Sequence, residues 1–311
     1  MKKHAVYELY LYSQTDTVID IVEEAKVMED VHSPLRVINK GHAVLGIIPA
    51  PDGTKPKPII GENCPKPVEW SKMRTYCREA FSEFFGTMVL VLFGNGVVAQ
   101  VVLSNGEKGD YQSISWGWGL GVMLGVYVSS ISGSHLNPAV TFTFCILRRF
   151  SWRKFPVYAL SQLLGGMSAA AIVYGNYKSA IDAYEGGAGI RTVPGYSDTA
   201  SGVIFCTYPA EFMTRTGQFF SEFVASSILM FLIFALTDKG NLAAGQLFPL
   251  VMFFTVFGIG ACFGWETGYA INLARDFGPR LVSYLLGYGT EVWTAGNYYF
   301  WVSLRSLDVA C

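Results

Sequence analysis

The fold is decided by two short stretches, Ser134-His135-Leu136-Asn137-Pro138-Ala139-Val140 and Gly268-Tyr269-Ala270-Ile271-Asn272-Leu273-Ala274-Arg275-Asp276. Each stretch follows an apolar run and places an asparagine where a short helix is predicted to begin. In a bilayer, helices that break in this way are tolerated only where they line a cavity. The pair therefore predicts a pore or transport site at the membrane midplane.

The surrounding chain is rich in long apolar runs. Of its 311 residues, 51% are hydrophobic and 15% are charged, and the mean hydropathy is +0.33. A bilayer core of about 30 Å needs about 20 mostly apolar residues per helix, and five runs suit that length. These runs, which predict an all-α, polytopic membrane protein, are Phe84–Leu103, Ile114–Ile131, Phe155–Tyr174, Phe219–Leu236 and Leu247–Phe263.

Charge and cysteine usage exclude several classes. The formal net charge of −1 gives no reason to expect a nucleic-acid partner. The six cysteines show no metal-ligand or CxxC spacing, so we interpret them as small buried hydrophobic residues. No nucleophile–base set is evident, so we expect neither an enzyme nor a cofactor.

The orientation follows from lysine and arginine near the ends of the spans. Basic residues precede the first span at 66–78 and lie between the second and third spans at 148–154. The positive-inside rule places both segments in the cytoplasm. Residues 1–75 are polar and rich in Pro, Lys and Glu, and we expect a cytoplasmic, largely disordered tail before a membrane domain at 76–311.

The membrane domain contains an inverted repeat. Phe81-Ser82-Glu83-Phe84 opens the first span and Phe220-Ser221-Glu222-Phe223 opens the fourth. The distance from glutamate to asparagine is 54 residues in one half and 50 in the other. Three spans separate the two starts, so the halves, about 78–175 and 217–311, are inserted with opposite orientations.

These motifs resemble those of the major intrinsic proteins, the aquaporins, over roughly residues 78–297. More narrowly, they are similar to the glycerol-conducting branch in fungi. The resemblance implies six tilted spans plus two re-entrant half-helices that meet head to head. It also implies a homotetramer in the lipid bilayer of the plasma membrane, with a pore in each subunit for glycerol, water and other small neutral solutes.

Asn137 and Asn272 are the predicted pore asparagines. Alone, each would be interpreted as an ordinary helix N-cap. Their symmetry within apolar surroundings instead predicts that each caps a half-helix and turns its NH₂ group toward the lumen. The two helix dipoles, each worth about +0.5 charge, would oppose cations at this point.

The resemblance assigns a narrow filter to Trp118, Gly260, Tyr269 and Arg275. Arg275 would donate to hydroxyl groups and repel cations. Trp118 and Tyr269 would form an aromatic corner, although without the motif they would fit an interfacial aromatic belt. Gly260 replaces the histidine of strict water channels and would leave room for a carbon skeleton. Tyr269 replaces the usual phenylalanine, so its hydroxyl would either narrow the filter or add a polar contact.

Four further residues are expected to support the pore. Asp276 should brace a loop or Arg275, because a buried carboxylate needs a partner. Glu83 and Glu222 should accept hydrogen bonds from the backbone of the half-helix loops. His135 should line the cytoplasmic vestibule and steady its loop, with a role in pH gating as the weaker alternative.

Two features depart from the family pattern. Leu273 stands where proline is usual, and we expect altered pore width or gating there. The sixth span should begin near Tyr298, but only 14 residues remain and they include Arg305 and Asp308, so we expect it to be truncated. This second feature keeps one alternative open: a non-conducting or regulatory isoform that assembles with full-length channels.

Overall fold

The computed structural model describes residues 69–300 and 302, together with four two-residue strands closer to the N-terminus. The chain divides into two units, Met1–Pro67 and Val68–Cys311. In the first unit, β1 (Tyr10–Leu11) pairs with β2 (Ile19–Asp20) and β3 (Leu45–Gly46) pairs with β4 (Ile59–Ile60), both antiparallel. Most of the predicted tail, 1–75, lies outside the described residues.

The second unit is helical and follows the predicted order of spans and half-helices as far as the second half-helix. The first half contains α1 (Glu69–Leu103), α2 (Tyr111–Val128), α3 (Pro138–Leu147) and α4 (Phe155–Tyr184). The second contains η1 (Gly202–Ile204), α5 (Arg215–Thr237), η2 (Gly245–Leu247), α6 (Phe248–Phe263), α7 (Leu273–Ser283), the π-helix η3 (Tyr284–Tyr288) and α8 (Glu291–Tyr298).

Four of the described helical segments are long and apolar enough to cross a membrane: Cys77–Leu103, Phe155–Tyr184, Arg215–Thr237 and Gly245–Phe263. The predicted second span forms α2, an 18-residue helix with four glycines that is not among these four segments. Most of the expected sixth span, from Tyr298 onward, lies outside the described residues.

Several helices of the bundle pack closely against one another. α1 packs along both α2 and α4, α2 packs on α6, and α4 packs on α7. Gly121 and Gly125 of α2 face the backbone of α1, where a β-carbon would lie 2.7 Å from the Leu90 carbonyl oxygen and 2.8 Å from the Gly86 carbonyl oxygen. The two glycines form a GxxxG pattern, and such small residues permit this close approach.

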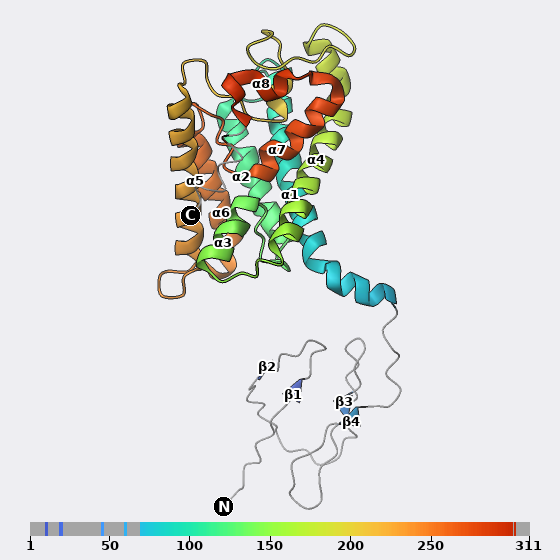
Figure 1. Cartoon of the computed structure of the whole chain (residues 1–311), viewed down its shortest axis with the longest axis vertical. Coiled ribbons are helices and arrows are strands. Elements are labelled where there is room, and N and C mark those ends of the chain that lie inside the picture. The colour runs from blue at the N-terminus through green and yellow to red at the C-terminus, as the bar shows by residue number, and fades with distance from the viewer. Residues whose placement is uncertain are drawn as a thin grey trace, which may run out of the picture. The chain divides into compact units, whose positions relative to one another are not determined.

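The two half-helices lie among these long helices. Figure 1 shows α3 in the lower part of the bundle and α7 in the upper part, each reached by a loop that enters from its own side. α3 packs on α4, and it also contacts α7. The N-termini of the two short helices therefore meet inside the bundle, which places the two decisive stretches together.

Candidate pore

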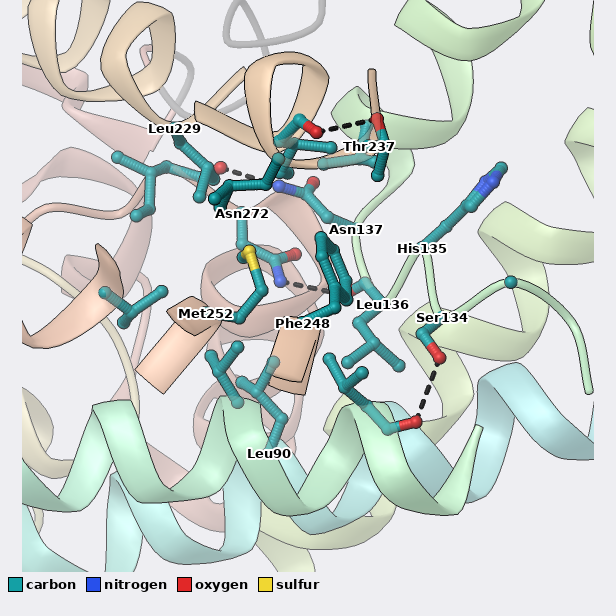
Figure 2. Close-up of a pocket in the computed structure, with 18 of the residues that line it drawn as sticks. Leu90, Ser134, His135, Leu136, Asn137, Leu229, Thr237, Phe248, Met252 and Asn272 are labelled. Carbon is teal, nitrogen blue, oxygen red and sulfur yellow. Dashed lines mark hydrogen bonds between the residues drawn. The ribbon is translucent and has the colours of Figure 1, made fainter. Parts of the chain in front are cut away.

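A cavity of about 470 Å³ is lined by residues from both halves of the membrane unit. Figure 2 shows Asn137 and Asn272 together in this lining. Most of the wall is apolar and comes from α1, α2, α3, α5 and α6: Leu90, Trp118, Val122, Val126, Val140, Phe144, Leu229, Ile233, Leu236, Phe248, Met252 and Val256. Polar groups therefore project from the two loops into a largely apolar passage.

Both asparagines cap the half-helices that follow them. The Asn137 Oδ1 atom accepts a hydrogen bond from the Ala139 N–H at 3.0 Å, and the Asn272 Oδ1 atom accepts one from the Ala274 N–H at 2.9 Å. Both residues have extended backbone angles, as an N-cap requires. The side-chain oxygen of each amide is thereby fixed, and its nitrogen must point elsewhere.

The two amide nitrogens cross to the opposite loop. The Asn137 Nδ2 atom donates to the Ile271 carbonyl oxygen at 2.7 Å, and the Asn272 Nδ2 atom donates to the Leu136 carbonyl oxygen at 2.8 Å. An amide NH₂ group carries two donors. One N–H of each asparagine is used in this exchange, which leaves the second for a molecule in the cavity.

Left-handed backbone at alternate positions shapes both loops. Ser134 and Leu136 have φ values of 57° and 54°, and Tyr269 and Ile271 have values of 39° and 38°. Such a conformation costs roughly 1–3 kcal/mol for a residue with a side chain and persists only where surrounding structure holds it. The same pattern at equivalent positions in both halves marks the loops as a matched functional element.

Glu83 holds the first loop in this shape. Its carboxylate accepts hydrogen bonds from the His135 N–H at 3.0 Å and the Leu136 N–H at 2.8 Å. The Ser132 hydroxyl and the Gln162 amide also donate to it, at 2.5 and 2.7 Å. Four donors on one buried carboxylate compensate for the loss of its hydration.

Glu222 does the same in the second loop. It accepts from the Ala270 and Ile271 N–H groups, both at 2.9 Å, and from the Thr267 hydroxyl at 2.7 Å. The Tyr299 hydroxyl donates to it at 3.0 Å and takes the place that the Gln162 amide has in the first half. In both halves, the loop backbone N–H groups donate hydrogen bonds to the glutamate, as the sequence predicts.

Three of the four predicted filter residues line the cavity: Trp118, Tyr269 and Arg275. The Arg275 guanidinium carbon lies 4.2 Å from the centroid of the Trp118 ring, a cation–π contact. The Arg275 Nη2 atom also donates to the Gly268 carbonyl oxygen at 3.3 Å. A fixed cation therefore faces an aromatic wall.

The fourth filter residue, Gly260, is not among the lining residues. A β-carbon there would lie 2.9 Å from both the Cζ and Oη atoms of Tyr269. The expectation that Gly260 leaves room for a carbon skeleton therefore needs correction. The tyrosine side chain fills the space that the glycine leaves.

Asp276 braces a loop through a buried ion pair. Its carboxylate accepts from the Thr207 N–H and hydroxyl, both at 2.7 Å, and pairs with the Arg280 Nη2 atom at 3.0 Å. Arg280 also donates to the Val292 carbonyl oxygen at 2.7 Å. Arg280 was not predicted as a site residue, although its spacing of four residues from Asp276 on one helix is a signal for such a pair.

His135 contributes to the cavity wall but points its ring away from the asparagines (Figure 2). Its Nδ1 atom lies 3.1 Å from the Thr141 hydroxyl oxygen. The ring packs against Phe144, Phe150 and Tyr158, with centroid distances between 4.8 and 5.3 Å. This packing fixes the imidazole beside the loop that its own N–H joins to Glu83.

Leu273 occupies the first position of α7 without disturbing its start. The Asn272 cap is intact and also accepts from the Arg275 N–H at 3.3 Å. The Leu273 side chain is buried and is not among the residues that line the cavity. The structure thus gives no local basis for the change in pore width that the missing proline suggested.

The chain is similar to known proteins over most of its length. The family model described as "Major intrinsic protein" matches residues 69–304. A probable aquaglyceroporin-2 from Gibberella zeae is 70% identical over 247 residues, which cover 79% of this chain and 73% of that protein. Aquaglyceroporin-9 from Botryotinia fuckeliana is 69% identical over 242 residues, 78% of this chain and 53% of that protein, so the chain spans about half of its length.

A solved structure has a similar fold. The crystal structure of the aquaglyceroporin from Plasmodium falciparum superposes with a TM-score of 0.66 and 33% sequence identity, covering 76% of this chain and 92% of that one. Family match, sequence relatives and fold therefore point to one group. The chain belongs to the major intrinsic protein family.

Proposed function

We propose that this chain forms a passive transmembrane channel for glycerol and other small neutral solutes, and for water. The names of its relatives support a glycerol channel. The observation that carries the proposal is the exchange of hydrogen bonds between Asn137 and Asn272 and the opposite loops, within an otherwise apolar cavity.

The asparagine pair accounts for passage of hydroxyl compounds. Each amide is fixed by its cap and by its bond to the other loop, so its remaining N–H is oriented before a solute arrives. A hydroxyl oxygen can accept from both. The N-termini of α3 and α7 add positive potential at the same place, equivalent to about +0.5 charge each, which disfavours cations.

Arg275 and its aromatic neighbour account for selection at the filter. The guanidinium is always charged and presents several donors, so it binds hydroxyl groups and repels cations. The opposite wall is the Trp118 ring, which suits the C–H face of a linear polyol. The Arg275 guanidinium carbon lies 4.2 Å from the centroid of the Trp118 ring. A solute must therefore either move these two side chains apart or pass beside them.

The channel performs no covalent chemistry in this proposal and needs no cofactor. The expected assembly is a homotetramer in the plasma membrane, with the N-terminus in the cytoplasm. The basic segment 148–154 between α3 and α4 supports that orientation under the positive-inside rule.

Stopped-flow light scattering of proteoliposomes tests the function. The full chain, reconstituted at known density, should conduct glycerol and water faster than protein-free vesicles. An Arg275→Val variant should raise proton leakage and alter the ratio of glycerol to water permeability. Folded protein with flux equal to that of empty vesicles would refute the proposal and favour the non-conducting isoform.

A further inference from the structure

The segment 148–154, which joins α3 to α4 and is called the basic loop below, carries positive charge and no acidic residue. Its basic residues are all exposed: Arg148, Arg149, Arg153 and Lys154. The segment 284–291, which follows α7 in the second half, contains no lysine or arginine and ends in Glu291. The inverted repeat therefore does not require this charge, which is a property of one loop.

Three of the four positive charges have no acidic partner in the part of the chain that the structure describes. The Lys154 Nζ atom lies 2.8 Å from the Glu79 Oε2 atom. The Arg148 guanidinium carbon lies 4.9 Å from the centroid of the Phe234 ring, a cation–π contact that involves no anion. The other two arginines make neither an ion pair nor a side-chain hydrogen bond with any described residue. The basic loop thus has donors available for an external anion.

Backbone hydrogen bonds hold the start of the basic loop in a tight turn. The Arg148 and Phe150 N–H groups both donate to the Phe144 carbonyl oxygen, at 3.0 and 3.1 Å. Arg149, between them, has a φ of 56°. A single left-handed residue of this kind commonly ends a helix. The backbone that carries the first two arginines is therefore defined before any ligand binds.

Exposed apolar side chains lie on both sides of these charges in the sequence. Trp152 is 54% exposed, and its ring packs edge-on against Phe142 with a centroid distance of 5.6 Å. Leu147 at the end of α3, and Val157 and Leu160 in α4, are between 49% and 58% exposed. In a chain that spans a bilayer, such residues face acyl chains, and tryptophan is enriched at the level of the headgroups. The basic loop is therefore placed where a headgroup and its acyl chains meet.

We infer that the basic loop binds the phosphate headgroup of an anionic lipid in the cytoplasmic leaflet. The inference rests on the orientation in the proposed function. A guanidinium group binds phosphate through two parallel hydrogen bonds. An anionic lipid supplies the negative charge that the arginines lack and also acyl chains for the apolar residues beside them. An acidic soluble protein would supply only the charge.

Native mass spectrometry of the purified full chain measures this binding. The chain is released from micelles that contain equal amounts of phosphatidylglycerol and phosphatidylcholine with the same acyl chains, and the retained molecules of each lipid are counted. The wild type should retain phosphatidylglycerol over phosphatidylcholine by more than tenfold. Inorganic phosphate and polyglutamate, added at matched concentrations of negative charge, should not displace the lipid.

A double variant tests whether the arginines carry the preference. Arg149→Gln/Arg153→Gln removes two side chains that have no partner to lose, so the fold should persist. It should lose most of the preference, because each basic residue near an anionic surface contributes about fivefold to binding. Lys108→Gln/Arg215→Gln removes the same charge from exposed residues before α2 and at the start of α5. This control should retain lipid as the wild type does.

The outcomes separate this inference from the proposed function, because lipid retention is measured without flux. Equal retention of the two lipids by the wild type would overturn the inference, even if the double variant cannot be purified. An equal loss in the control would also overturn it, as would displacement by phosphate, which indicates a free anion, or by polyglutamate, which indicates an acidic protein. Lipid preference in a chain that conducts no glycerol would overturn only the proposed function.

Discussion

The amide nitrogen of Asn137 donates to the carbonyl oxygen of Ile271 at 2.7 Å, across the point where the two half-helices meet. The Asn272 amide returns the bond to Leu136 at 2.8 Å. Each asparagine thus caps its own helix and holds the other loop. The two loops are thereby hydrogen-bonded to each other at this point, so the two halves depend on each other for their geometry.

The first prediction concerns this exchange. Asn137→Ala removes an N-cap and leaves the buried Ile271 carbonyl without its donor, which should destabilise the fold by about 2–4 kcal/mol. Glycerol flux should fall because the fixed N–H donor is lost. Denaturation in detergent and stopped-flow flux measure the two effects. Asn241→Ala, at an exposed loop residue, serves as the control and should change neither.

The second prediction concerns Glu83. Glu83→Gln keeps the size of the side chain but sets an NH₂ group against four donors, so at least one buried group loses its partner. The loss should be about 1–3 kcal/mol for each unpaired group. Thermal denaturation in detergent measures it. Glu107→Gln, at an exposed position, is the control, and equal melting temperatures for the two variants would contradict this role of Glu83.

The sequence was sufficient to predict the inverted repeat, the two half-helices and the residues on the loops, because these depend on local patterns that recur in both halves. The position of Tyr269 relative to Gly260 could not be predicted. It depends on how α2 and α6 cross, and the sequence contains no signal for the depth of one ring between two helices. For the same reason, the sequence could not decide whether the Tyr269 hydroxyl narrows the filter or adds a polar contact.

The partners of Asp276 could be predicted from the sequence only in part. A buried carboxylate required a partner, which the sequence analysis placed in a loop or in Arg275. The structure supplies Thr207 from a distant loop and Arg280 from the same helix. The first contact is separated by 69 residues and has no sequence signature, whereas the second follows from helical spacing.

The third prediction uses this ion pair. Asp276→Asn or Arg280→Gln alone leaves an uncompensated charge at a fully buried site and should cost about 3–5 kcal/mol. The double variant Asp276→Asn/Arg280→Gln should cost less than the sum, because no isolated charge remains. A double-mutant cycle measured by denaturation tests the coupling. Additive losses would show that the two side chains act independently.

The fourth prediction concerns the departure at Leu273. Leu273→Pro restores the usual proline at the first position of α7. Proline has no backbone N–H, and an N–H at this position has no partner inside the helix, so its loss costs little. The Asn272 cap is already formed and the leucine lies away from the cavity, so glycerol and water permeability should stay close to wild type. A clear change in either permeability would mean that Leu273 influences the pore through its packing.

The temperature dependence of glycerol flux tests the central claim most directly. Glycerol permeation is measured by stopped flow across a range of temperatures, with proteoliposomes of the full chain and protein-free vesicles of the same lipid. A continuous polar pathway through the two asparagines predicts a faster flux with a much lower activation energy than that of the bare bilayer. The same rate and the same activation energy in both preparations, with folded protein present, would contradict the account.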